Sequence, residues 1–222
     1  MVHPAWKAAS LVVFPLAAFL GVGTLIKGAS HRELATTALR NAHAARCPTS
    51  AAPLNMRLLG YTGPEFADYW RVLGNPVFAD TLPPGTPCPA ASAPTARTPA
   101  WAAEERFIWL DLGFPLVYGG ALIASLLVAW RVAGRPLRRA WVLAPPVALM
   151  VADWIENSAQ LQQLSRWSPG TVGAVQGPWV AIASAATTGK WIATGVTVAL
   201  LLWLAWPRRI AVPAQNLVPA VE

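Results

Sequence analysis

The hydrophobic residues of this chain gather in four long apolar runs, over about residues 8–26, 107–129, 141–164 and 179–206. Each run holds at least 19 residues, and about 20 apolar residues are enough for a helix to cross the hydrocarbon core of a bilayer. The pattern predicts an all-α fold: a four-helix transmembrane bundle with a small helical, disulfide-linked extracytoplasmic segment between the first two spans. The predicted divisions are a first span 1–27, an extracytoplasmic segment 28–105, a second span 106–131, a cytoplasmic link 132–140, a third span 141–164, an outer link 165–178, a fourth span 179–207 and a cytoplasmic tail 208–222.

The first apolar run, from Ala8 to Ile26, has two interpretations. It follows the basic residue Lys7, and the Gly-Ala-Ser sequence at 28–30 would suit a cleavage site, as in a signal peptide. Its 19 residues are also long enough to span a membrane. We expect a retained span, bent at Pro15.

The polar segment 28–105 contains two predicted amphipathic helices. Two capping-box patterns, each a Ser or Thr three residues before a Glu, predict their starts: Ser30 with Glu33, and Thr62 with Glu65. The first helix would run over about 31–46, and the second would stop at Gly74. The second helix repeats its large apolar side chains at helical spacing: Phe66, Tyr69, Trp70 and Leu73. From 75 to 100 the chain is rich in Pro, Ala and Thr, which predicts irregular structure.

The two cysteines of the chain, Cys47 and Cys88, both lie in this polar segment. We predict that they form a structural disulfide, because such bonds are typical of an extracytoplasmic location. Closing a loop of this length would stabilise the segment by about 4 kcal/mol. No CxxC pair and no Cys/His cluster at zinc spacing is present in the sequence.

The distribution of basic residues predicts the orientation. Lys7 precedes the first run, Arg208 and Arg209 follow the last, and four arginines lie at 131–139, whereas the link 165–178 has only Arg166. The positive-inside rule therefore places both termini and the 132–140 link in the cytoplasm, in a multi-pass protein of the plasma (inner) membrane. Tryptophans at the predicted span ends agree with an aromatic belt: Trp6, Trp130, Trp141, Trp203 and Trp206 inside, and Trp101, Trp109, Trp167 and Trp179 outside.

One polar stripe lies inside the third apolar run. Asp153, Glu156, Asn157 and Gln160 are spaced i, i+3, i+4 and i+7, which places them on one face of a helix. Ionisable groups are costly inside a membrane and need partners. The stripe therefore predicts a polar cluster facing the interior of the bundle.

The other spans supply partners at a similar depth. Counting about 1.5 Å per residue from the cytoplasmic end of each span places the stripe, Tyr118 and Lys190 in the outer half of the membrane. We expect Lys190 to pair with Glu156 or Asp153, and Tyr118 to form a hydrogen bond with Asp153. Asp111 would lie at the outer mouth of the cluster, with Arg106 or Asn157 as its partner. Pro115 lacks an N–H group, so the backbone carbonyl of Asp111 would be left open.

Two short patterns in these spans resemble those of a known family. Asp111-x-x-Phe114-Pro115-x-x-Tyr118-Gly119, followed by Asp153-x-x-Glu156-Asn157, is similar to the pattern of a family of small bacterial four-span membrane proteins whose activity is uncharacterised. The resemblance covers the second and third spans, together with the stretch from Tyr61 to Gly74. It implies a fold and a topology, and it implies no activity.

The chemistry available to the spans is limited. The three histidines lie outside the spans, and there is no Gly-rich phosphate loop, so we expect no cofactor. A carboxylate-only metal site at Asp111, Asp153 and Glu156 is disfavoured by the nearby Lys190, so we predict no metal. The basic residues are scattered and lack interleaved aromatic residues, which argues against nucleic-acid binding.

Three functional interpretations stay open beside a purely structural role of the cluster as a link between helices. The leading one is a non-enzymatic accessory subunit of a larger membrane complex, or a binder of a lipid or small hydrophobic ligand with a buried polar pocket. The second is a membrane-embedded lipid-modifying enzyme with Asp153 and Glu156 as acid and base. The third is an ion- or proton-coupled carrier. Four spans are few for such a protein, and the sequence shows no inverted repeat.

Overall fold

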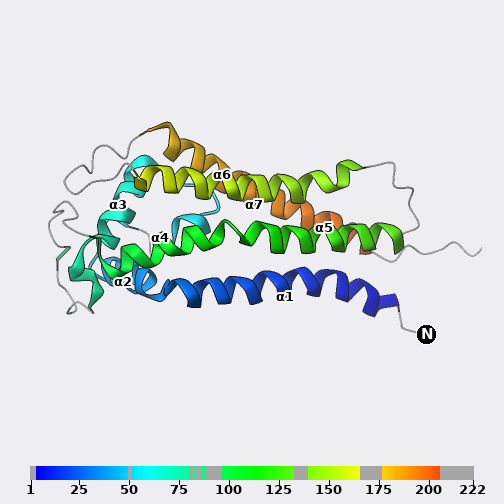
Figure 1. The fold of residues 1–222 in the computed structure, drawn as a ribbon, viewed down its shortest axis with the longest axis horizontal. Coiled ribbons are helices and arrows are strands. Elements are labelled where there is room, and N and C mark those ends of the chain that lie inside the picture. The colour runs from blue at the N-terminus through cyan, green and yellow to red at the C-terminus, as the bar shows by residue number, and fades with distance from the viewer. Residues whose placement is uncertain are drawn as a thin grey trace, which may run out of the picture.

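The computed structural model describes residues 4–49, 52–80, 83, 87–88, 97–132, 140–165 and 177–205. Long helical rods lie alongside one another, and shorter helices gather at one end (Figure 1). The rods are α1 (Pro4–Ser30), α4 (Pro99–Asp111) continued by α5 (Phe114–Val132), α6 (Ala144–Ser165) and α7 (Pro178–Ala205). The short elements are α2 (Glu33–Ala44), η1 (Leu54–Met56), α3 (Gly63–Leu73), η2 (Pro76–Ala79) and η3 (Ala140–Leu143).

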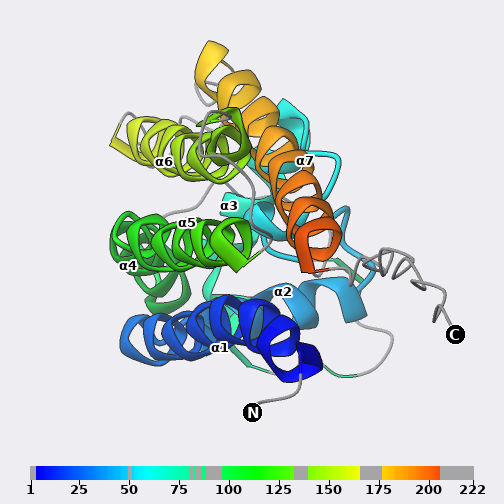
Figure 2. The same ribbon diagram turned by 90° about the vertical axis from the view of Figure 1, so that its right-hand side faces the viewer.

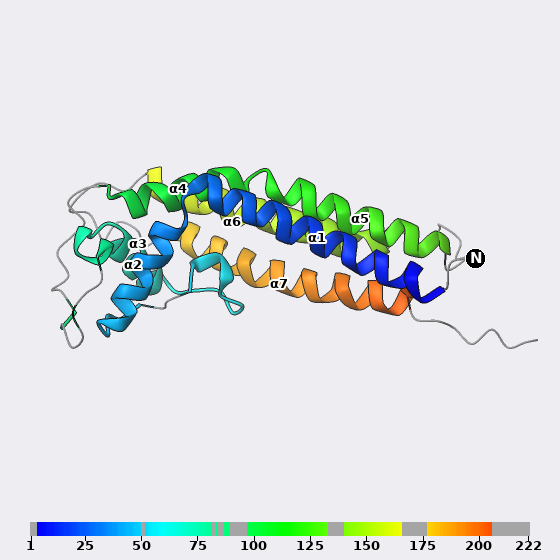
Figure 3. The same cartoon turned by 90° about the horizontal axis from the view of Figure 1, so that it is seen from below.

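The rods alternate in direction along the chain. The start of α1 and the end of α7 lie at the end of the bundle opposite to α2 and α3 (Figure 3). Viewed along the rods, α5 lies between α1 and α6, and α7 packs closely against α6 (Figure 2). The all-α prediction is confirmed, and the described residues contain no β-strand.

Three helical stretches are long and apolar enough to cross a membrane: Val13–Ser30, Pro99–Arg131 and Pro178–Leu204. They correspond to the first, second and fourth predicted spans. α6, which covers the third predicted span, does not meet the same threshold among the described residues. The links 133–139 and 166–176 and the tail from 206 lie outside the described residues, and with them most of the arginines that predicted the orientation.

The second predicted span is two helices instead of one. α4 ends at Asp111, Leu112 and Gly113 form a turn, and α5 begins at Phe114. Pro115 lies in the first turn of α5, where its missing N–H group leaves no helical bond broken. The break therefore lies beside Asp111, where Pro115 predicted a local opening of the backbone.

The short helices form a second layer around a core of large aromatic side chains. Trp70, Trp101, Tyr69 and Phe66 are almost fully buried among α2, α3 and α4. The capping box of Thr62 and Glu65 is present, as predicted. So are the buried apolar face of α3 and the end of that helix at Gly74.

The first predicted capping box is wrong. α2 begins at Glu33 with Arg32 at its N-cap, and no side chain caps it. Ser30 is the last residue of α1, where its hydroxyl donates to the carbonyl oxygen of Lys27. His31, at a φ of 56°, turns the chain between the two helices, so Ser30 is committed to the preceding helix. The segment 75–100, expected to be irregular, contains η2 and the start of α4.

The disulfide between Cys47 and Cys88 is confirmed, and it closes a sequence separation of 41 residues. We expect Cys47→Ser with Cys88→Ser to lower the free energy of unfolding by about 4 kcal/mol, because the unfolded chain regains the entropy of the open loop. Denaturant unfolding of the purified protein in mild micelles measures this loss. Reduction of the wild type should give the same loss, and an unchanged midpoint in both experiments would contradict the prediction.

Candidate functional site

The polar face of α6 is turned into the protein. Asp153, Glu156, Asn157 and Gln160 are each at most 3% exposed. The opposite face of the helix is open and mainly apolar: Val147, Val151 and Ile155 are more than 40% exposed, and Ser158 is its exposed hydroxyl. This distribution is the reverse of that on a helix at a water-facing surface. The stripe predicted from the sequence is therefore a buried polar face.

Lys190 of α7 connects two carboxylates of this face. Its ammonium group donates to Asp153 Oδ1 at 2.8 Å and lies 2.5 Å from Glu156 Oε2. The Lys190 side chain is 11% exposed, and the two carboxylates are less so. The hydroxyls of the neighbouring stripe on α7 donate to backbone carbonyls of their own helix: Thr187, Thr194 and Thr197.

Tyr118 of α5 completes the partners of Asp153. Its hydroxyl donates to Asp153 Oδ2 at 2.9 Å, which is the predicted bond. The ring of Tyr118 lies 4.7 Å from that of Phe114 and 5.8 Å from that of Phe19 on α1, measured between centroids. Asp153 thus uses both carboxylate oxygens, one toward α7 and one toward α5, which joins three rods at one point.

Asp111 lies beside the break between α4 and α5. Its Oδ2 atom accepts a hydrogen bond from the amide nitrogen of Asn157 at 3.1 Å, whereas Arg106, the other predicted partner, is exposed. The indole nitrogen of Trp154 on α6 donates to the carbonyl oxygen of Leu112 at 2.9 Å. A backbone carbonyl freed by the break is therefore satisfied by the facing helix, as a membrane interior requires.

Sequence reasoning missed the part that the outer segment plays in the cluster. The hydroxyl of Tyr61 accepts a hydrogen bond from Gln160 Nε2 at 3.3 Å, and the same nitrogen donates to Glu156 Oε1 at 3.3 Å. Burial, with a further contribution from the charge of Glu156, raises the pKa of Tyr61 above its usual value. The signal in the sequence for this role was the position of Tyr61 directly before the capping box of Thr62 and Glu65. Its hydrogen-bond partner Gln160 lies 99 residues away in the sequence.

A second buried charge cluster, at the junction of α1, α2 and α4, was also missed. The guanidinium group of Arg32 donates from Nε and Nη2 to the two oxygens of Glu104, at 2.8 and 2.6 Å. It also donates to Asn55 at 3.0 Å and lies 3.4 Å from the ring centroid of Phe107. Although burial alone would lower the pKa of Arg32, the carboxylate of Glu104 raises it above its usual value.

The charges of the first cluster do not balance. Asp111, Asp153 and Glu156 supply three carboxyl groups against the single ammonium of Lys190. The next cation, Arg32, is paired with Glu104. The cluster must therefore hold protons, water or a further cationic group if it is to remain buried. Among the described residues, no group of three His, Cys, Asp or Glu side chains is arranged to hold a metal ion.

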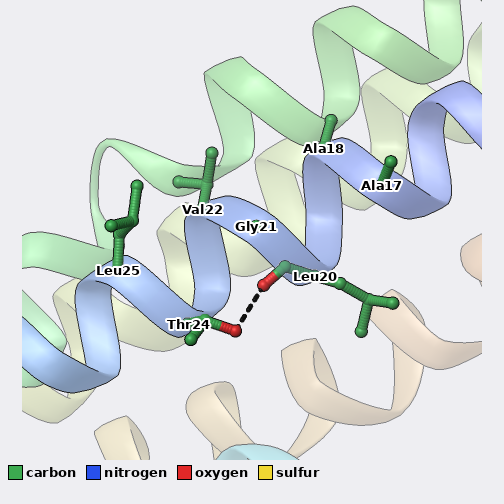
Figure 4. A pocket seen from close by; sticks show the side chains of 7 residues that line it. All are labelled: Ala17, Ala18, Leu20, Gly21, Val22, Thr24 and Leu25. Carbon is green, nitrogen blue, oxygen red and sulfur yellow. Dashed lines mark hydrogen bonds between the residues drawn. The ribbon is translucent and has the colours of Figure 1, made fainter.

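A shallow, open groove of about 650 Å³ lies on the surface of α1, between Ala17 and Leu25 (Figure 4). Its walls are apolar, and its one hydroxyl, that of Thr24, donates to the carbonyl oxygen of Leu20 at 2.7 Å. No residue of the polar cluster lines this groove. On its inner side, Val22 packs against the apolar residues around Tyr118.

Comparisons with protein-family models, with curated proteins and with solved structures gave no match to this chain.

Proposed function

We propose that this chain is a four-span protein of the plasma membrane, with α6 as its third span and both termini in the cytoplasm. Three helices already have the length and hydropathy of spans. α6 has 22 residues, or about 33 Å, and both of its charged groups are buried while its exposed side chains carry no charge. Hydropathy averaged over all faces understates such a helix, because its polar side chains meet partners instead of lipid.

The disulfide supports the proposed orientation. Disulfides persist in oxidising compartments, so the end of the bundle that carries Cys47 and Cys88 belongs outside the cytoplasm. The start of α1 and the end of α7 lie at the opposite end (Figure 3). The arginines of the sequence at 131–139 and 208–209 favour the same orientation.

We infer that the protein acts by binding, as an accessory subunit of a larger membrane complex or as the binder of a lipid or small hydrophobic ligand. The observation that carries this inference is the excess of carboxyl groups over cations in a cluster tied to the outer segment through Tyr61. A cluster that served only to join helices would need one carboxylate for its one lysine.

Native mass spectrometry of protein extracted from its own membrane tests this function. A small bound mass that is present in the wild type and lost in Asp153→Asn would identify a ligand of the cluster. A protein partner at fixed stoichiometry would identify a subunit. Thr197→Val is the matched control, because among the described residues the Thr197 hydroxyl bonds to its own helix, at the carbonyl oxygen of Ala193. Bare wild-type monomer would contradict the proposal.

A lipid-modifying enzyme is the second candidate. It is favoured by the contact of Tyr118 and Lys190 with the same carboxylate, Asp153, which places proton donors and acceptors within 3 Å of one another. In that case Asp153→Asn and Glu156→Gln would each change the lipid composition of a membrane that carries the protein, and Thr197→Val would not. Unchanged lipid profiles on deletion of the protein would reject this candidate.

A further inference from the structure

The segment from η1 to the start of α3 carries an apolar tip that nothing in the described chain covers. Met56, Leu58 and Leu59 are 53%, 60% and 92% exposed. The segment is nevertheless held at both sides, because Leu54 and Tyr61 are 1% and 5% exposed. These three side chains are therefore presented by an anchored turn.

The one charge in this turn is directed into the protein. The Arg57 side chain is 10% exposed, and its guanidinium group lies 3.2 Å from Glu65 Oε1. The other oxygen of Glu65 accepts hydrogen bonds from the backbone N–H and the hydroxyl of Thr62, at 2.7 and 2.8 Å. These bonds lower the pKa of Glu65 and keep it ionised opposite Arg57. The outward face of the turn itself is left without a charge, and the charge beside it, on Glu65 of α3, is 50% exposed and faces Arg57.

The turn lies directly against the membrane helix α7. The backbone N–H of Tyr61 donates to the hydroxyl of Ser184 at 2.9 Å. Gly60 has a φ of +74°, and a side chain there would collide with Ser184. The turn accordingly runs beside the first turns of α7 (Figure 3). Only glycine combines this backbone conformation with so close an approach.

The contact with Ser184 gives the depth of the turn. The stretch of α7 that is long and apolar enough to cross a membrane begins at Pro178, and Ser184 lies six residues further along the helix, or about 9 Å toward the membrane centre. At that level the surface of α7 carries an apolar side chain that the described protein leaves open, because Ile182 is 40% exposed. The apolar tip continues this surface.

We propose that Met56, Leu58 and Leu59 form a wedge inserted among the lipid acyl chains of the leaflet at the α2–α3 end of the bundle. The occupant of this surface is lipid, because the tip shares the depth and the apolar character of the exposed face of α7. The wedge would fix the outer segment on the membrane beside Tyr61, and it does not depend on the role of the polar cluster.

A spin label tests the wedge. The chain has only the disulfide-bonded Cys47 and Cys88, so Leu59→Cys supplies a single thiol for a nitroxide. The protein is reconstituted in vesicles of phosphatidylcholine and phosphatidylglycerol, and collisions of the label with oxygen and with a water-soluble nickel chelate are measured. Labels at Ile192, which is 63% exposed on α7, and at Arg40, which is exposed on α2, are the lipid and water controls.

We expect the ratio of oxygen to nickel collisions at Leu59 to shift to the value found at Ile192, with the same shift for a label at Leu58. A ratio equal to that at Arg40 would place the tip in water and overturn the wedge. Low collision rates with both reagents would indicate cover by protein, and would also overturn it. A water-like ratio at Ile192 itself would instead reject the assignment of α7 as a span.

Discussion

Replacing Lys190 by methionine is expected to lower the free energy of unfolding by about 3–5 kcal/mol, the cost of leaving a buried charge without its partner. Lys190 is the only cation within 3 Å of Asp153 and Glu156 among the described contacts. Without the ammonium group, the carboxylates of Asp153 and Glu156 would be left buried side by side with no cation between them. Either they repel each other or they must be neutralised, and both outcomes cost stability in the native state.

The measurement is an unfolding titration in mixed micelles of a mild detergent and dodecyl sulfate. Thr197→Val serves as the control on the same helix, since its hydroxyl bonds to the carbonyl oxygen of Ala193 and reaches no other helix. Combining Lys190→Met with Asp153→Asn and Glu156→Gln should restore most of the lost stability, because a neutral set of similar volume leaves no unpaired charge. Equal losses in the Lys190 variant and in the Thr197 control would contradict a paired cluster.

The rescue experiment also separates structure from function. If the neutral triple variant is stable but loses the ligand or the partner seen with the wild type, the charges serve binding. If it is stable and retains both, the cluster serves mainly to join α5, α6 and α7. The stability measurement and the binding measurement therefore answer different questions about the same side chains.

Local patterns in the sequence were sufficient to predict the members of the polar cluster that lie on one helix, α6. The spacing of Asp153, Glu156 and Asn157 fixes a common face, and membrane energetics require that face to turn inward. Lys190 and Tyr118 were predicted as partners from their depth in the membrane, because counting residues along a straight span gives the height of a side chain. The Lys190–Asp153 ion pair and the Tyr118–Asp153 hydrogen bond are both present in the structure.

Contacts that depend on how the outer segment folds back could not be predicted in this way. Arg32 and Glu104 are 72 residues apart, and Tyr61 and Gln160 are 99 apart. No local periodicity links such pairs. The capping box predicted at Ser30 is absent for a related reason. The sequence has the pattern of such a box, but α1 extends to Ser30, and α2 begins only at Glu33. α6 is not among the helices with the length and hydropathy of a span, and a window average of hydropathy takes no account of which face each side chain occupies.

Arg32→Met is expected to lower the free energy of unfolding by about 3–5 kcal/mol, because it leaves the buried carboxyl group of Glu104 without its cationic partner. The side chains of Arg32 and Glu104 are only 5% and 4% exposed, and two hydrogen bonds join them. Arg32 also packs on Phe107 and bonds to Asn55, so a single group connects the end of α1, the η1 turn and α4. Lysine at this position cannot form the paired bonds of the planar guanidinium, so Arg32→Lys should recover only part of the loss.

The chain supplies its own control for this prediction. Arg71 pairs with Asp68 on α3, where the two side chains are 27% and 20% exposed, and partly exposed pairs contribute about 0–1 kcal/mol. Arg71→Met should therefore change the unfolding midpoint little. Combining Arg32→Met with Glu104→Gln should regain much of the stability lost in Arg32→Met alone. If Arg32→Met and Arg71→Met were equally mild, the junction of the outer segment with the bundle would have to be held by the disulfide and the aromatic core instead of by this ion pair.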